Sequence, residues 1–210
     1  MSEIKNIVFD MGNVLILYDY KQILTRHGIT DESEQLLVKN TLFDSEPWRE
    51  YDRGTVEKDS FIPVIDSLPE HLAALCRKIV LEQCFALNEM PPFPVMFDIV
   101  KRLKENGYKI YLLSNAGKDF AVYSKNIPAL TLFDGKFVSS DYLLLKPEDA
   151  IYRKFFEVFG LNPNECIFID DVKANTEGAI KNGMDAICFN SSLEPHEVLI
   201  EKLRKKGIKI

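Results

Sequence analysis

From residue 91 onward, hydrophobic residues follow two patterns that alternate along the chain. In some segments they recur every three or four positions, as on one face of an α-helix; residues 93–107 carry Met96, Ile99, Val100 and Leu103 in this way. Other segments are short and almost entirely apolar, which is typical of strands buried on both faces. These patterns predict helices at 93–107, 147–160 and 174–183, and strands at 108–116, 135–140, 165–171 and 185–190.

Residues 4–10 form one more apolar run, which ends at Asp10, so we expect this run to join the same sheet. Strands separated by helices form parallel sheets that are covered on both sides. The expected fold class is therefore α/β, with a parallel Rossmann-like sheet and helices on both faces.

Residues 18–90 interrupt this alternation. They contain few β-like runs but have helical patterns at 31–43 and 71–87, with breaks at Arg53-Gly54 and at Pro69. We interpret them as a small all-helical cap domain inserted after the first strand, with 1–17 and 91–210 forming the α/β core. Aromatic residues spaced like Phe43, Trp48 and Tyr51 more often form the core of such a cap than a surface that binds substrate.

Composition and charge narrow the range of partners. The chain has 210 residues and a formal net charge of -6, and binding to a phosphate backbone requires a basic face instead. There is no run of about 20 apolar residues and no signal-peptide pattern at the N-terminus. The three histidines and four cysteines lack zinc-ligand spacing. We expect a monomeric cytoplasmic protein that binds neither nucleic acid nor membranes.

Polar residues gather where the predicted strands end. The first strand ends at Asp10, the strand at 108–116 contains Ser114-Asn115, and the strand at 165–171 ends in Asp170-Asp171. Lys146 follows the strand at 135–140 and precedes a helix. Each of these residues alone could cap a turn or a helix. In an open parallel sheet, however, ligands bind at the carboxyl ends of the strands, so all of these residues are expected at one site.

The residue types at this edge indicate a particular chemistry. Three neighbouring carboxylates repel one another unless a cation neutralises them or one takes up a proton. Oxygen ligands without His or Cys favour a hard cation, first of all Mg²⁺. A lysine with hydroxyl and amide donors suits a phosphate oxygen. These features predict a Mg²⁺-dependent phosphoryl-transfer site with an aspartate nucleophile.

The ordered segments "FDMGNV", "LLSN", "KP" and "FIDDVKAN" resemble the four motifs of the haloacid dehalogenase superfamily, most of whose members are phosphatases. The resemblance covers essentially the whole chain, including the helical insertion in the place of the family's cap. It is closest to the branch with an FD-x-G-N-V first motif, which includes a bacterial glucose-1-phosphate phosphatase.

The resemblance implies a role for each matched residue. Asp10 would be both the nucleophile and a Mg²⁺ ligand, and the Gly12 carbonyl and the Asp171 carboxylate would be further ligands. Gly12 would also allow the sharp turn after the strand. Asp170 and Asn175 would lie beside the metal ligands. The phosphate would be bound by Ser114, Asn115 and Lys146, and Lys146 would also orient Asp10.

The chain departs from the superfamily pattern at Gly12. Most members carry an Asp there that protonates the leaving group, and Gly12 cannot do this. Asp19 is the nearest candidate donor, although a helix N-cap is the more common role for such a residue. Arg53 is a candidate for contacting an anionic or sugar substrate. A missing acid favours small phosphorylated metabolites with a weakly basic leaving oxygen, such as anomeric sugar phosphates.

Two alternatives remain. A 2-haloacid dehalogenase releases halide, which needs no protonation, but it requires no Mg²⁺ and so leaves Asp170-Asp171 unexplained. A non-catalytic module that binds a phosphorylated metabolite has no use for Asp10, whose charge opposes a phosphate.

Overall fold

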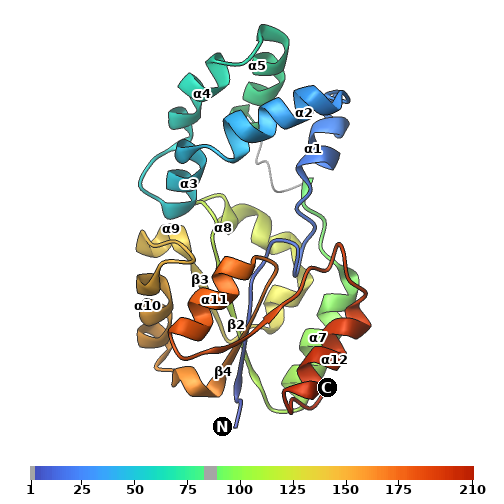
Figure 1. Cartoon of the computed structure of the whole chain (residues 1–210), viewed down its shortest axis with the longest axis vertical. Coiled ribbons are helices and arrows are strands. Elements are labelled where there is room, and N and C mark those ends of the chain that lie inside the picture. The colour runs from blue at the N-terminus through green and yellow to red at the C-terminus, as the bar shows by residue number, and fades with distance from the viewer. Residues whose placement is uncertain (1–2, 83–88) are drawn as a thin grey trace.

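A computed structural model describes residues 3–82 and 89–210. Its sheet contains β1 (Asn6–Phe9), β2 (Lys109–Ser114), β3 (Gly135–Val138), β4 (Cys166–Asp170) and β5 (Asp185–Cys188). The strands are ordered β3-β2-β1-β4-β5, and every neighbouring pair is parallel. The predicted α/β fold with a parallel Rossmann-like sheet is confirmed (Figure 1).

Helices cover both faces of the sheet, whose central strands β1, β2 and β4 are buried on both sides. On one face, Ile7 and Phe9 of β1 pack in the same core as α7 (Pro94–Glu105) and α12 (His196–Lys205). On the other face, Val8 packs with residues of α10 (Asp149–Phe159) and α11 (Lys173–Lys181). The shorter elements of this part are α8 (Phe120–Tyr123), α9 (Ser139–Tyr142), η4 (Ser124–Asn126), η5 (Pro128–Leu132) and η6 (Pro163–Glu165).

The described residues between β1 and α7 form a layer of helices above the sheet (Figure 1). They comprise α1 (Tyr20–Arg26), α2 (Glu32–Val38), η1 (Lys39–Phe43), α3 (Glu46–Arg53), η2 (Lys58–Phe61), α4 (Ile62–Asp66), α5 (Glu70–Arg77) and η3 (Lys78–Glu82). Residues 83–88, which include the end of the helix expected at 71–87, lie outside the described residues. We refer to this helical layer as the cap; that it is a separate domain, with boundaries at 18 and 90, remains a prediction.

Two connections join the cap to the core, and they run side by side. The Leu17 amide donates to the Pro91 carbonyl at 2.9 Å, and the Phe93 amide donates to the Leu15 carbonyl at 2.9 Å. The outgoing and returning segments therefore form a short antiparallel pair. This pairing positions the cap over the carboxyl ends of the strands.

In the described part of the chain, no helix combines the length and the apolar character needed to cross a membrane.

Candidate active site

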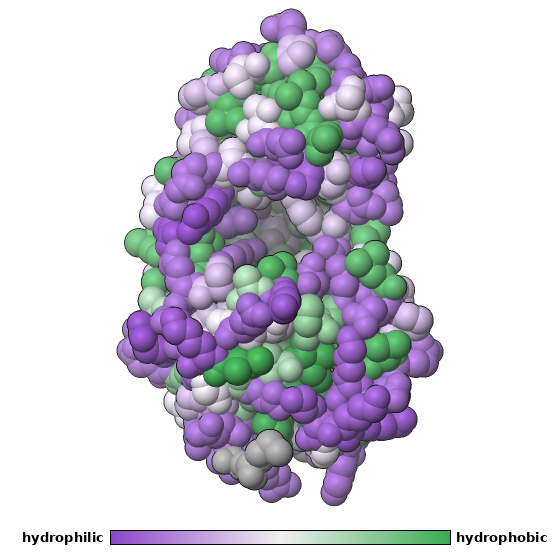
Figure 2. Space-filling view, in the orientation of Figure 1, coloured by the Kyte–Doolittle hydropathy of each residue, from purple (hydrophilic) through white to green (hydrophobic). Residues whose placement is uncertain are grey.

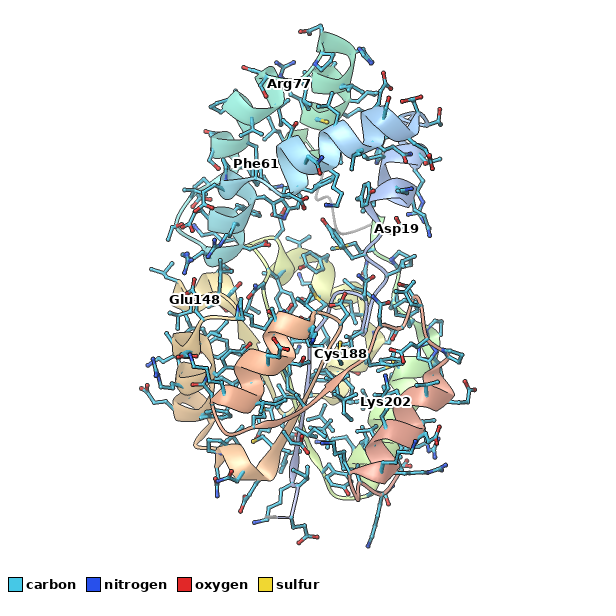
Figure 3. All side chains as sticks on the ribbon, in the orientation of Figure 1. Asp19, Phe61, Arg77, Glu148, Cys188 and Lys202 are labelled. Atoms are coloured by element: carbon cyan, nitrogen blue, oxygen red, sulfur yellow. The ribbon has the colours of Figure 1, made fainter. Side chains whose placement is uncertain are left out.

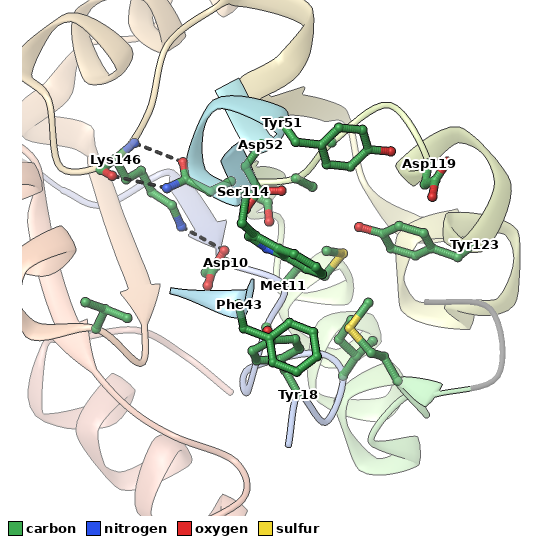
Figure 4. A pocket seen from close by; sticks show the side chains of 18 of the residues that line it. Asp10, Met11, Tyr18, Phe43, Tyr51, Asp52, Ser114, Asp119, Tyr123 and Lys146 are labelled. Carbon is green, nitrogen blue, oxygen red and sulfur yellow. Dashed lines mark hydrogen bonds and ion pairs between the residues drawn. The ribbon is translucent and has the colours of Figure 1, made fainter. Parts of the chain in front are cut away.

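The carboxyl edge of the sheet brings the predicted site residues together. Asp10 follows β1, Ser114 ends β2, and Asp170 ends β4. Because β1 lies between β2 and β4, these three strand ends are neighbours. Figure 4 shows Asp10, Ser114 and Lys146 around one pocket, with a dashed line joining Lys146 to Asp10.

Lys146 lies between two carboxylates. Its Nζ is 2.7 Å from Oδ1 of Asp10 and 2.7 Å from Oδ2 of Asp170, and the Lys146 side chain is only 1% exposed. Burial by itself lowers the pKa of Lys146, but the charges of Asp10 and Asp170 outweigh burial and raise it above its ordinary value. The lysine is therefore a fixed buried cation beside the expected nucleophile.

Asp170 acts on this site through Lys146. The carboxylate is fully buried and also accepts hydrogen bonds from the Val172 amide at 2.7 Å and from Asn175 Nδ2 at 3.1 Å. Tyr152 in turn donates to the Asn175 carbonyl at 2.7 Å. These bonds fix the carboxylate that holds the ammonium in place, and they bring Asn175 into the site as the sequence predicts.

Asn115 is engaged with the backbone of Lys146. Its Oδ1 accepts from the Lys146 amide at 2.9 Å, and its Nδ2 donates to the Lys146 carbonyl at 3.1 Å. This reciprocal pair positions the lysine from β2's side of the sheet. A role for Asn115 as a phosphate ligand remains a prediction.

Three carboxylates gather at the same edge. Oxygens of Asp10, Asp170 and Asp171 lie within 4.8 Å of one another. Burial is the largest cause that raises the pKa of Asp10, to about 7; Lys146 lowers it and Asp170 raises it further. Burial likewise raises the pKa of Asp171. Three carboxylates with one ammonium carry surplus negative charge, and a donor set of oxygens alone fits Mg²⁺.

The turn after Asp10 depends on Asn13 and does not require a glycine at position 12. Asn13 has the left-handed backbone conformation in this turn, with φ of 51°. A Cβ on Gly12 would meet only Tyr18, at 4.0 Å. Asn13 Oδ1 accepts from the Tyr18 amide at 3.0 Å, and Nδ2 donates to Asp171 Oδ2 at 3.2 Å. The expectation that Gly12 is needed for a sharp turn is wrong, because Asn tolerates the left-handed conformation and also orients Asp171. A metal-binding role for the Gly12 carbonyl remains a prediction.

Above Asp10 lies a cavity of about 380 Å³, within the range of small-molecule sites. Figure 2 shows the surface hollowed between the cap and the core. Core residues that line the cavity include Asp10, Ser114, Asn115 and Lys146. From the cap and its connection come Tyr18, Phe43, Asp44, Trp48, Tyr51 and Asp52.

The cap aromatics serve both the cap core and the cavity. Phe43 and Trp48 meet edge to face with ring centroids 4.9 Å apart, and Trp48 stacks on Phe61 at 5.3 Å. Phe43, Trp48 and Tyr51 also line the cavity. The expected core role is therefore confirmed, since Phe43 and Tyr51 are buried in the hydrophobic core and Trp48 packs against it, and the same three residues also contribute to the wall of the cavity.

Two predicted residues lie elsewhere. Asp19 is the N-cap of α1, where its Oδ1 accepts from the Lys21 and Gln22 amides, and it is not among the residues that line the cavity (Figure 3). Arg53 also lies outside that lining and donates to both carboxylate oxygens of Glu148, at 2.9 and 2.7 Å. In this structure both side chains thus have other partners, and the roles of Asp19 as the acid and of Arg53 as a substrate contact remain predictions.

Sequence reasoning missed Asp44, Asp52 and Asp119, three further carboxyl residues that line the cavity. Burial raises the pKa of Asp52 to about 7, although a hydrogen bond from the Gly117 amide lowers it in part. Asp119 pairs with Lys58 at 2.7 Å. Asp52 precedes the break at Arg53-Gly54, but no local pattern in the sequence distinguishes it from an exposed helix residue.

A parallel sheet with a buried carboxylate–lysine cluster under a lined cavity has the architecture of an enzyme active site. The chain belongs to the haloacid dehalogenase-like hydrolases, whose family model matches residues 4–183. Membership of the superfamily is thereby confirmed, whereas the branch that includes the glucose-1-phosphate phosphatase remains a prediction.

Individual relatives span two activities. The chain is 28% identical over 194 residues to the sesquiterpene phosphatase astK of Aspergillus oryzae, covering 90% of this chain and 91% of that protein. It is 26% identical over 113 residues to (S)-2-haloacid dehalogenase 4A of Burkholderia cepacia, covering 53% of this chain and 49% of that protein. A haloacid dehalogenase family enzyme of Bacteroides thetaiotaomicron, solved with magnesium and inorganic phosphate, has a TM-score of 0.65 at 19% identity over 93% of this chain and 98% of that one. This last likeness concerns the fold alone.

Proposed function

We propose that this hydrolase is a Mg²⁺-dependent phosphatase of small phosphate monoesters that works through an aspartyl-phosphate on Asp10. The observation that carries the proposal is the position of Asp10, which lies 2.7 Å from the Lys146 ammonium and within 4.8 Å of two further carboxylates. A carboxylate held in this way can attack phosphorus while the lysine neutralises charge on the transferring group.

The residues of the site divide into distinct tasks. Asp10 attacks, Ser114 at the end of β2 binds a phosphate oxygen, and Lys146 both orients Asp10 and binds phosphate. Asp10, the Gly12 carbonyl and Asp171 would hold Mg²⁺, while Asp170 is left to hold Lys146. When bound, the cation offsets the negative charge of the carboxylates and of the phosphate, so that the two anions can approach.

The overall similarity to a sesquiterpene phosphatase, which extends over nine-tenths of both chains, supports phosphate ester hydrolysis. The match to a haloacid dehalogenase covers about half of each chain. The sugar-phosphate preference expected from the sequence belongs to this proposal as well: the aromatic side chains of the cap can contact a sugar ring, and a weakly basic leaving oxygen reduces the need for an acid.

The test is turnover of 4-nitrophenyl phosphate, glucose 1-phosphate and 2-chloropropionate by purified protein, with Mg²⁺ or with a chelator. We expect phosphate release that depends on Mg²⁺, and we expect Asp10→Asn to abolish it because a neutral amide is a far weaker nucleophile. Chloride release that survives the chelator would instead identify a dehalogenase. A fully folded protein that releases neither product would favour a binding module.

A further inference from the structure

The proposed reaction leaves one proton unassigned. When Asp10 attacks phosphorus, the ester oxygen leaves as an alkoxide unless a group protonates it, and such protonation commonly contributes about 10²–10⁴ in rate. Gly12, two residues after the nucleophile, has no side chain that could do this. If a side chain supplies this proton, it must be another group that lines the cavity.

Within the lining of the described cavity, three carboxyl residues accompany Asp10: Asp44, Asp52 and Asp119. Asp44 forms an ion pair with Lys39, and Asp119 forms one with Lys58. An ion pair occupies each of these two carboxylates with a cation in place of a leaving group. Among the residues that the structure describes, no cation forms an ion pair with Asp52.

Contacts between the end of α3 and the core fix the position of Asp52. The Ser139 hydroxyl donates to the Asp52 carbonyl, and Arg53 binds Glu148 through two nitrogens. Gly54 has φ of 90°, and a Cβ there would lie 2.4 Å from the Ser140 carbonyl oxygen, so the two backbones are in close contact. Figure 4 shows Asp52 among the residues that line the same pocket as Asp10 and Ser114.

We propose that Asp52, supplied by the cap, is the general acid that protonates the leaving group, in place of the side chain that Gly12 lacks. This inference rests on the proposed phosphatase function. It assigns the cap a chemical role as well as a role in enclosing the substrate.

The protonation state of Asp52 suits this role. Burial raises its pKa to about 7, so a large fraction carries a proton near neutral pH, where general acids are most effective. The charge of Asp52 raises the pKa values of Tyr18 and Tyr51. The other titratable groups that line the cavity are Asp10, Asp44, Tyr123, Lys146 and the Asp119–Lys58 pair.

The proton balance closes over both halves of the reaction. An oxygen of Asp10 forms a bond to phosphorus as the bond between phosphorus and the ester oxygen breaks. The Asp52 proton moves to the ester oxygen, and an alcohol is released. The Asp52 carboxylate then takes a proton from a water whose oxygen bonds to phosphorus as the bond between phosphorus and the Asp10 oxygen breaks. Inorganic phosphate leaves, and both carboxyl groups return to their starting states.

Two substrates of similar shape but different leaving groups distinguish a role of Asp52 in proton transfer from a role in substrate binding. Benzyl phosphate releases a strongly basic alkoxide, whereas 4-nitrophenyl phosphate releases a weakly basic phenolate that needs no proton. We expect Asp52→Asn to lower kcat/KM for benzyl phosphate by about 10²–10⁴ and for 4-nitrophenyl phosphate by less than about tenfold. In the wild type, kcat/KM for benzyl phosphate should also fall above about pH 7, and the variant should lose that dependence.

Asp119→Asn is the matched control, because it removes another cavity carboxyl that is paired with Lys58. It should change kcat/KM for the two substrates by the same factor. Thermal unfolding of both variants with Mg²⁺ present checks that they are folded. If Asp52→Asn does not fold, the pH dependence of the wild type with the two substrates decides the question.

Equal losses on both substrates in Asp52→Asn, or no loss on benzyl phosphate, would overturn the assignment of Asp52. Failure of the proposed function has a different signature, since a wild type that is not a phosphatase turns over neither substrate. If the protein is a phosphatase but Asp52 is not its acid, turnover will still depend on Mg²⁺ and will still be abolished by Asp10→Asn.

Discussion

The ammonium nitrogen of Lys146 lies 2.7 Å from Oδ1 of Asp10. The same nitrogen lies 2.7 Å from the fully buried carboxylate of Asp170, so one cation serves two acids. A buried charge is stable only when it is paired, and here the pairing also holds the expected nucleophile at the edge of the sheet. Folding and chemistry therefore depend on the same contact, which makes Lys146 the first residue to change.

Lys146→Met should reduce turnover of 4-nitrophenyl phosphate by about 10² or more, because charge on the transferring phosphoryl group loses its neutralising partner. It should also destabilise the protein by about 3–5 kcal/mol, since two buried carboxylates lose their cation. Activity assays and denaturant unfolding measure the two effects.

The exposed Lys154, which pairs with Glu157, offers a matched control, and Lys154→Met should change neither quantity appreciably. Adding Asp170→Asn to Lys146→Met should recover part of the stability but none of the activity. A double variant that regained turnover would show that Lys146 acts only through folding.

Asp171→Ala should weaken Mg²⁺ binding more than it affects any other property. Activity should fall at low Mg²⁺ and recover partly as the Mg²⁺ concentration rises. Mg²⁺ should raise the Tm of the wild type, because a ligand that binds only the folded state stabilises it, and this rise should be smaller in the variant. An equal rise in both proteins would place the cation elsewhere. Asp66→Ala, which removes an exposed carboxylate paired with Arg77, serves as the control.

Asp52 should make stability depend on pH. Its folded pKa of about 7 exceeds its ordinary value of 3.8, so the folded state binds the proton more tightly. The stabilisation that this provides is complete below about pH 3.8 and is lost as pH rises toward 7. Asp52→Asn lacks this titration, so the Tm of the variant relative to the wild type should increase between pH 4.5 and 7.5. A constant difference across that range would show that the carboxyl is not shifted.

The contact between Arg53 and Glu148 should couple the cap to the core. Its side chains are 18% and 34% exposed, so we expect a modest contribution of about 0.2–1 kcal/mol. Arg53→Met and Glu148→Gln should each lower kcat/KM for benzyl phosphate by a small factor, and the double variant should be little worse than either single one. If Arg53 contacted substrate directly, Arg53→Met alone would raise KM and Glu148→Gln would not reproduce it.

Asp19→Ala should affect stability and leave activity unchanged. Loss of a helix N-cap costs about 0.5–2 kcal/mol, and Asp19 caps α1 through its bonds to Lys21 and Gln22. The ratio of kcat/KM for glucose 1-phosphate and glucose 6-phosphate should be the same in the variant and the wild type. A selective loss with the 6-phosphate would restore Asp19 as a proton donor.

The sequence alone was sufficient to predict the parallel sheet and the cluster of polar residues at the carboxyl ends of its strands. Runs of apolar residues about as long as a strand, separated by helical patterns, leave little alternative to a parallel sheet. Once β1, β2 and β4 are assigned, Asp10, Ser114 and Asp170 must meet at one end, because parallel strands all point the same way. Lys146 could be assigned to the same edge because it follows β3.

Only the tertiary structure decided how the cap completes the site. Arg53 meets Glu148, 95 residues away, and Asp52 enters the cavity because the end of α3 packs against α9. The left-handed residue proved to be Asn13, whose side chain is needed to orient Asp171 from across the sheet edge. Local patterns report which face of an element is apolar, but the packing of one domain on another depends on contacts between distant segments, and a shift of one helical turn would replace Asp52 with a different residue.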